Sequence, residues 1–222
     1  TSNVGAWLML DAVHYAPRFS IDVEALDVDF LICSAYKFYG PHVGILYSRE
    51  GLLDQLEPDR LRTQDPQAPY RIETGTLNHA AIVGVKAAIE YIAALGTGPD
   101  LRSKVVTAMH LIGEHERSLA ATLHAGLTSL RGVTVYGPLF GAQQRAPTVS
   151  FTVGSKRAEE VCTRLGERGF CTWDGHFYAL RAIEVLGLLE RGGVTRAGIS
   201  LYNSIDEVSR LLDELEQIAA SR

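Results

Sequence analysis

Three short apolar runs near the start of the chain constrain its fold more than any other feature. They are AWLML (residues 6–10), VDFLICS (residues 28–34) and VGILYS (residues 43–48), and polar or turn-forming residues bound each of them. Apolar runs of this length are typical of buried strands in an α/β sheet. Because the first run begins almost at residue 1, a parallel sheet there would lack earlier neighbours. We therefore expect further sequence upstream.

Apolar residues recur at helical spacing in two segments that follow these runs. The first extends from Asn78 to Leu95, and Asn78 is a plausible N-cap for it. The second extends from about Asp100 to Leu130 and is long enough to cross between domains. Residues 57–70 carry three prolines and no clear period, which predicts a loop.

The pattern changes near residue 131, where strand-like and helical runs begin to alternate. The predicted strands are VTVYG, APTVSFTV and TRAGISLY, and the predicted helices lie near residues 157–168, 179–187 and 205–219. We therefore divide the chain into two domains. Residues 1–130 are predicted to form a large-sheet domain with its connecting helix, and residues 131–222 a smaller α/β domain.

Composition excludes several classes of function. The formal net charge of −5 offers no basic field for nucleic acid, and no apolar run reaches the roughly 18 residues that span a bilayer. The opening TSNVGAWLML lacks the features of a signal peptide. Three cysteines without a CxxC pair argue against a disulfide framework or a zinc site, so we expect no metal and a reducing, cytoplasmic location.

Polar residues gather where two of the predicted strands end. Asp11 and His14 follow the first run as DAVH, and Ser34, Tyr36 and Lys37 follow the second as SAYK. Open α/β sheets bind ligands at such strand ends. The aromatic neighbours of Lys37 could partly desolvate its amine and favour a Schiff base with a carbonyl group. On spacing alone a surface lysine in a turn is the commoner outcome, and both interpretations stay open.

The segment DAVHYAPRFSIDVEALDVDFLICSAYKFYGPHVGILY resembles the cofactor segment of the class V aminotransferase and cysteine desulfurase family nearly position by position. The shared pattern is an Asp, a Ser-x-x-Lys motif, a Gly-Pro turn and a glycine-containing strand. The resemblance continues through IETGTLNH into the last domain. It implies the C-terminal portion of a pyridoxal-phosphate-dependent transferase of the aspartate aminotransferase type I fold. The expected class is α/β, with part of the large parallel or mixed-sheet domain followed by the small α/β domain.

The resemblance also implies roles for the residues at the strand ends. Lys37 would hold pyridoxal 5′-phosphate as a Schiff base and then act as the general base. Asp11 would pair with the pyridine nitrogen, and His14 would reach the ring oxygen beside the catalytic lysine. Ser34 and Tyr36 would meet the cofactor phosphate, with Tyr36 in place of the histidine common in cysteine desulfurases. The family's phosphate-binding turn and ring-stacking residue are not found before Asp11.

The resemblance also implies residues that contact a partner subunit or the substrate. Thr76 of the Gly-Thr turn would reach the phosphate of a second subunit, which implies a homodimer with a shared active site. Arg196, in TRAGISLYN, would bind the carboxylate of an amino-acid substrate, and His176 would line the same pocket. The alternatives are a loop residue for Thr76, a solvated surface arginine for Arg196 and a structural histidine for His176. Tyr202 and Asn203 are expected to shape the turn before the last helix.

One position departs from the cysteine desulfurase pattern. The loop reads WDGHFYAL, and the place of the nucleophilic cysteine falls on Tyr178. Cys171 stands earlier, in GFCTW, and we expect it to be a buried structural cysteine.

The sequence therefore predicts a pyridoxal-phosphate-dependent aminotransferase or lyase that acts on an amino acid but lacks the desulfurase nucleophile. One alternative is a truncated or non-catalytic paralogue that only dimerises, and another is an unrelated α/β binding domain.

Overall fold

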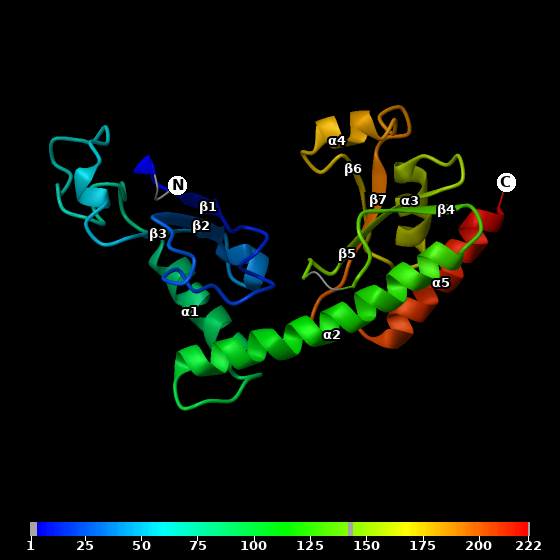
Figure 1. The fold of residues 1–222 in the computed structure, drawn as a ribbon, viewed down its shortest axis with the longest axis horizontal. Helices are drawn as coiled ribbons and strands as arrows, with labels where there is room; N and C mark the ends of the chain where they lie inside the picture. Colours follow the sequence, from blue (N-terminus) through cyan, green and yellow to red (C-terminus); the bar gives the residue numbers. More distant parts are fainter. Residues whose placement is uncertain (1–3, 142–143, 222) are drawn as a thin grey trace. The chain divides into compact units, whose positions relative to one another are not determined.

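The architecture is α/β, with two separate sheets and the helices that accompany them (Figure 1). The computed structural model describes residues 4–141 and 144–221. The chain divides into two units, Thr1–Leu111 and Ile112–Arg222, and each is described by itself. The sequence prediction placed the division after residue 130. The structure divides the chain inside the long helix α2 (Leu101–Ser129), because the second part of this helix contributes Leu119, Leu123 and Leu127 to the core of the second unit.

Three strands form the sheet of the N-terminal unit in the order β1-β2-β3. They are β1 (Met9–Asp11), β2 (Phe30–Ser34) and β3 (Gly44–Ser48). β1 runs parallel to β2, and β3 runs antiparallel to it. All three predicted strands are present, although the first is shorter than its apolar run. One face of this sheet packs on a small core made by Ala12, Val28 and Leu31.

A tight turn carries the chain from β2 back into β3. It begins with a single 3-10 turn, η2 (Ala35–Phe38), and continues through Tyr39, whose φ is 70°. The N–H of Gly40 donates to the carbonyl of Ala35 at 2.9 Å, and the N–H of Ala35 donates to the carbonyl of Val43, also at 2.9 Å. These bonds hold Lys37 on a closed backbone turn at the end of a buried strand.

The segment from β3 to the next helix contains the predicted loop. A short 3-10 turn, η3 (Leu53–Gln55), comes first, and residues 57–70 form neither helix nor strand, as predicted. Arg71 is buried and anchors this segment, since its guanidinium donates to the carbonyls of Asp54 and Leu56.

Helix α1 (His79–Ala93) begins where the sequence predicts. The side chain of Asn78 accepts a hydrogen bond from the N–H of Ala81 at 3.1 Å, which makes it the N-cap. A Cβ atom at Gly84 would lie 3.1 Å from Cγ of Pro41. The helix therefore packs closely on the Gly40-Pro41 turn, and glycine makes that approach possible.

The sheet of the C-terminal unit has the order β4-β5-β7-β6, and every neighbouring pair is antiparallel. Its strands are β4 (Val133–Tyr136), β5 (Thr148–Val153), β6 (Trp173–Gly175) and β7 (Val194–Gly198). Strand β7 ends earlier than predicted. Asn203 accepts a hydrogen bond from the N–H of Ser200 and forms a turn there, which confirms the role expected for Asn203.

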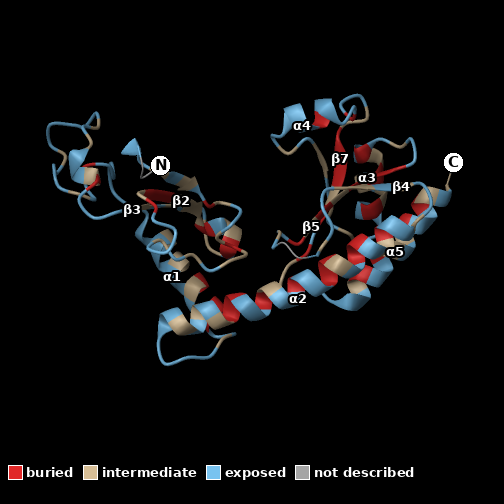
Figure 2. Cartoon of the chain, viewed as in Figure 1, coloured by how far each residue is buried: buried red, intermediate tan, exposed pale blue. Residues whose placement is uncertain are grey.

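Helices α2, α3 (Ala158–Glu167) and α5 (Ile205–Ala220) accompany this sheet, and α4 (Leu180–Val185) follows β6. The core gathers Val149, Phe151 and Val153 of β5 with apolar residues of α2, α3 and α5 (red in Figure 2). A capping box made by Ser204 and Glu207 starts α5. All the predicted helices are confirmed.

Two features are absent from the part of the chain that the structure describes. No helix there is long and apolar enough to cross a membrane. Among the same residues, no group of three or more His, Cys, Asp or Glu side chains is placed to hold a metal ion.

Candidate functional site

Asp11 and Ser34 lie on the same face of the N-terminal sheet, at the same edge. Asp11 pairs in register with Ile32 on the parallel strand β2, and Ser34 follows Ile32 by two residues. Side chains two residues apart on a strand share a face, as do register partners on adjacent strands. The topology therefore brings together two of the residues that the sequence singled out.

Lys37 lies on the η2 turn that directly follows Ser34. It is half-buried, and its Nζ lies 4.9 Å from the centroid of the Tyr36 ring, a cation–π distance. Within the described residues the Lys37 amine has neither a hydrogen bond nor an ion pair. The amine is thus held close to an aromatic face but remains open to an incoming carbonyl group.

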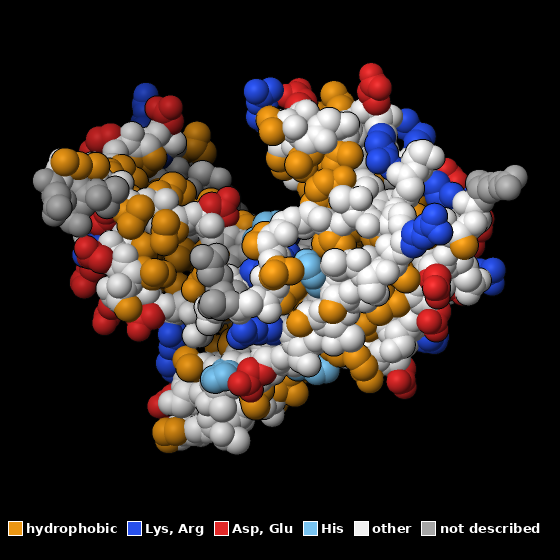
Figure 3. Space-filling model, turned by 45° about the vertical axis from the view of Figure 1, so that its right-hand side comes forward, with side chains coloured by type: hydrophobic (Ala, Val, Ile, Leu, Met, Phe, Trp, Pro, Cys, Tyr) orange, Lys and Arg blue, Asp and Glu red, His pale blue; other side chains and the backbone are white. Residues whose placement is uncertain are grey.

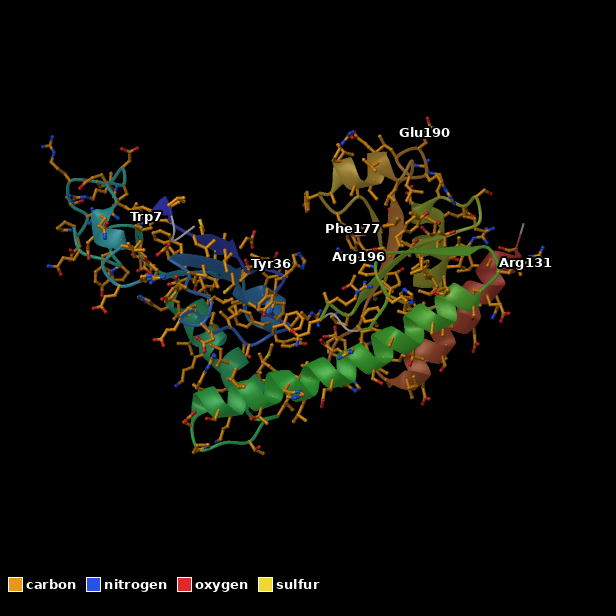
Figure 4. All side chains as sticks on the ribbon, viewed as in Figure 1. Trp7, Tyr36, Arg131, Phe177, Glu190 and Arg196 are labelled. Carbon is orange, nitrogen blue, oxygen red and sulfur yellow. The ribbon has the colours of Figure 1, made fainter. Side chains whose placement is uncertain are left out.

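Tyr36 also stacks on a residue that the sequence analysis did not single out. The rings of Tyr36 and His42 lie 4.6 Å apart at an interplanar angle of 14°, and both side chains are exposed (Tyr36 is labelled in Figure 4). The turn through Gly40-Pro41 returns the chain and places His42 beside Tyr36. The only sequence signal for this pair is the Gly-Pro turn between the two residues.

Asp11 and His14 lie in the segment that leaves β1. Oδ1 of Asp11 accepts a hydrogen bond from the N–H of Val13 at 3.0 Å, which orients the carboxylate. His14 is exposed in the turn that follows.

Thr76 lies in an exposed bend just before α1, after Gly75 with a φ of 70°. Its hydroxyl makes no hydrogen bond within the described residues. An open pocket of about 460 Å³ lies next to this bend. Its lining contains none of the other predicted site residues and consists of Leu61, Thr63, Gln64, Asp65, Tyr70, Glu73, Thr74 and Gly75.

Arg196 and His176 belong to the C-terminal unit, where Phe177 links them. The guanidinium carbon of Arg196 lies 3.8 Å from the centroid of the Phe177 ring, and the two residues are labelled in Figure 4. Desolvation by burial lowers the pKa of Arg196 from its ordinary value. No carboxylate pairs with Arg196 among the residues that the structure describes. A partly desolvated guanidinium without a counter-ion is suited to bind an anion.

The loop after β6 holds two residues in the left-handed region. Phe177 has a φ of 51° and Tyr178 a φ of 63°, which side chains with a Cβ adopt at a cost. Nδ1 of His176 accepts the N–H of Tyr178 at 3.2 Å, so neutral His176 carries its proton on Nε2. The loop presents the side chain of Tyr178 fully to solvent.

The thiols differ from expectation at one position. Cys171 is exposed, so the prediction of a buried structural cysteine is wrong. It stands just before β6, next to Phe170, which packs against the core while the Cys171 side chain lies at the surface. Cys33 and Cys162 are half-buried, and all three are free.

Comparison with protein families gives one match that covers nearly the whole chain. The model of the aminotransferase class-V family matches residues 1–211. A cysteine desulfurase of Escherichia coli strain SE11 is 31% identical over 227 aligned residues, which cover 96% of this chain and 51% of that protein. The cysteine desulfurase of Escherichia fergusonii has the same identity and coverage. The chain thus spans about half the length of the curated relatives that it matches.

Solved structures agree with this family match. The apo cysteine desulfurase of Thermococcus onnurineus NA1 superposes with a TM-score of 0.84 at 28% identity, over 98% of this chain and 54% of that one. The cysteine desulfurase CsdA of Escherichia coli, in its S-sulfonic acid form, gives a TM-score of 0.77 at 26% identity, over 97% of this chain and 52% of that one. These likenesses confirm the predicted type I fold of pyridoxal-phosphate-dependent enzymes.

Proposed function

The chain belongs to the aminotransferase class-V family, and from this premise we propose that it takes part in pyridoxal-phosphate-dependent chemistry on an amino acid. The observation that carries the proposal is the group at the edge of the N-terminal sheet. Asp11 and Ser34 share one face at the ends of parallel strands, and Lys37 follows on the next turn with its amine open.

These residues fit the cofactor that the family uses. Pyridoxal phosphate needs an amine to react with its aldehyde, a carboxylate for its ring nitrogen and donors for its phosphate. Lys37, Asp11 and the hydroxyls of Ser34 and Tyr36 supply these groups. The Ser34 hydroxyl makes no cap hydrogen bond to η2, which leaves it available as a donor.

Bound there, the cofactor supplies an electron sink for a carbanion on the substrate. Lys37 Nζ would remove the proton from the substrate Cα. The Asp11 carboxylate, oriented by the Val13 N–H, would keep a proton on the ring nitrogen, and His14 would donate to the ring oxygen. In the C-terminal unit, Arg196 would hold the substrate carboxylate, and the Nε2–H of His176 would serve as a further donor.

Tyr178 separates the proposed reaction from that of a cysteine desulfurase. The position where the family resemblance expects a nucleophilic thiol holds a phenol that is fully exposed. A phenol cannot form a persulfide. We therefore favour transamination or an elimination over the release of sulfur from cysteine.

The test of the proposal is an absorbance spectrum of the purified chain after addition of pyridoxal phosphate. We expect a visible band in the wild type that is lost in Lys37→Ala, because only an amine at this position reaches the cofactor aldehyde. Lys86→Ala is the matched control, since Lys86 is an exposed lysine of the same unit whose ammonium pairs with Glu90 on α1. It should keep the band.

Two results would contradict the proposal. A band that survives in Lys37→Ala would mean that another amine reacts, and Lys37 would be an ordinary turn lysine. No band in the wild type would favour the alternative of a non-catalytic relative that only dimerises.

The proposal includes a homodimer with a shared active site and a cytoplasmic location. Support for the first comes from Thr76, which is exposed on its bend and makes no hydrogen bond within the part of the chain that the structure describes, as a residue that serves a second subunit would. Support for the second comes from the three free thiols.

A further inference from the structure

A row of side chains crosses one face of the C-terminal sheet at Arg196. The register pairs Tyr136 with Ser150, Ser150 with Arg196, and Arg196 with Trp173. Directly paired residues of antiparallel strands point to the same face. Arg196 is therefore flanked by a hydroxyl on one side and by an indole on the other. The opposite face carries Val149 and Phe151, which belong to the core.

Phe177 covers Arg196 from the loop that follows β6. Its ring is partly buried against an apolar cluster of Ile183, Leu188 and Val194, and the guanidinium carbon of Arg196 lies 3.8 Å from the ring centroid. Packing against this cluster anchors the ring. The ring in turn removes one face of the guanidinium from water.

The backbone under Phe177 is held in a conformation that this residue does not favour. Its φ of 51° lies in the left-handed region, where the Cβ crowds the following carbonyl oxygen and strains the backbone. The carbonyl of His176 accepts the N–H of Ala179 at 2.7 Å and so closes the turn around this position. The strained backbone seats an aromatic ring on an arginine that pairs with no carboxylate among the described residues, which points to a functional constraint on that ring.

We propose that Phe177 is a positioning residue that holds the Arg196 guanidinium for a planar carboxylate. The stack confines the side chain of Arg196 to the face it shares with Ser150 and Trp173, so that its N–H groups remain free for two parallel hydrogen bonds to one anion. Pre-ordering the guanidinium removes part of the entropy cost of binding. The inference rests on the proposed function, and it names the group that fixes the carboxylate end of the substrate.

NMR of the Arg196 side chain, on the full chain, tests two things separately. One is the contact between the Phe177 ring and the guanidinium, and the other is the binding of an anion to Arg196. In the wild type we expect ring-current shifts on the Arg196 Hδ and Nε–H resonances, which are lost in Phe177→Leu. Titration with sodium acetate, against sodium chloride at equal ionic strength, gives the affinity for a carboxylate. We expect the acetate Kd to rise about five- to tenfold in Phe177→Leu, because acetate must then order the arginine side chain itself.

Two further variants separate positioning from simple packing. Phe177→Tyr keeps the ring and should restore the wild-type Kd. Val185→Ala alters an exposed apolar residue of α4 and should leave the Kd unchanged. An equal acetate Kd in wild type and Phe177→Leu, with the ring-current shift lost, would overturn the inference. The inference would also be overturned if acetate shifted the Arg196 resonances of the wild type no more than chloride does.

A second titration connects this site to the substrate. With pyridoxal phosphate bound, Phe177→Leu should weaken the spectral response to L-alanine by the same factor as it weakens acetate binding, and should leave the response to ethylamine unchanged. Equal loss for both amines would overturn the inference, because ethylamine has no carboxylate. If no cofactor band forms at all, the proposed function fails, whereas the acetate titration still decides whether Phe177 positions Arg196.

Discussion

The three thiols of the chain lie in different surroundings. Burial raises the pKa of Cys33, and it also raises the pKa of Cys162, whose Sγ accepts a hydrogen bond from the Thr172 hydroxyl. Cys171 is exposed. Because the thiolate is the reactive form, a raised pKa leaves less of it at neutral pH. The chemistry of each thiol is thus set by what packs around it.

Iodoacetamide at pH 7.5 should therefore alkylate Cys171 first and the other two thiols much more slowly, as measured by peptide mass spectrometry over time. We also expect the chain with alkylated Cys171, and the variant Cys171→Ser, to keep the wild-type response to amino acids. If either change abolished that response, Cys171 would be a relocated nucleophile. The presence of Tyr178 would then no longer speak against the release of sulfur from cysteine.

At the scale of elements, the ends of β6 and β7 hold the loop that carries Phe177. Gly175 pairs with Val194, and Gly193, just before β7, has a φ of 86°. A Cβ atom at Gly193 would lie 2.2 Å from the carbonyl oxygen of Gly175. The two backbones meet so closely that only glycine fits between them, and that contact sets where the loop begins.

Gly193→Ala should lower the thermal stability of the chain through both backbone strain and this clash. The strain costs about 1–2 kcal/mol, and overpacking adds roughly 1–3 kcal/mol. Gly187→Ala is the matched control, because Gly187 also has a positive φ, 68°, but has open space around its missing Cβ. Calorimetry should show the larger drop in Tm for Gly193→Ala. Equal drops would mean that β6 moves away at no cost.

At the scale of the molecule, the N-terminal unit leaves many large apolar side chains exposed. Met9 is 57% exposed and Val83 on α1 is 66% exposed, and hydrophobic side chains gather on the visible face of this unit (Figure 3). Exposed apolar surface of this kind marks sites of association. The proposed homodimer would cover part of it.

Sedimentation velocity over a range of concentrations should therefore show a dimer. Val83→Lys should shift it toward monomer, since a charge on α1 would be desolvated in the interface. Lys104→Gln, at an exposed position on the other helix, α2, should leave the dimer intact. A wild type that stays monomeric at every concentration would rule out the homodimer.

The sequence by itself determined the kinds and order of the elements, and the placement of Asp11, Ser34 and Lys37 at strand ends. Hydrophobic periodicity is local, so a run such as VDFLICS indicates a buried strand wherever its neighbours lie. The long cofactor segment also indicated the family, because it resembles the class V aminotransferase segment nearly position by position. The pattern predicts the ends of elements less accurately. The predicted strand TRAGISLY is longer than β7, which ends at Gly198, before the turn that Asn203 makes.

Only the tertiary structure decided which side chains meet. The stack of His42 on Tyr36 and that of Phe177 on Arg196 form because a turn or a loop between strands brings the residues together. The Gly-Pro turn indicates that the chain reverses between Tyr36 and His42, but it does not indicate that their rings meet. The exposure of Cys171 was missed for the same reason. Burial depends on what packs over a residue, and that is a property of the folded chain rather than of the residues beside it in sequence.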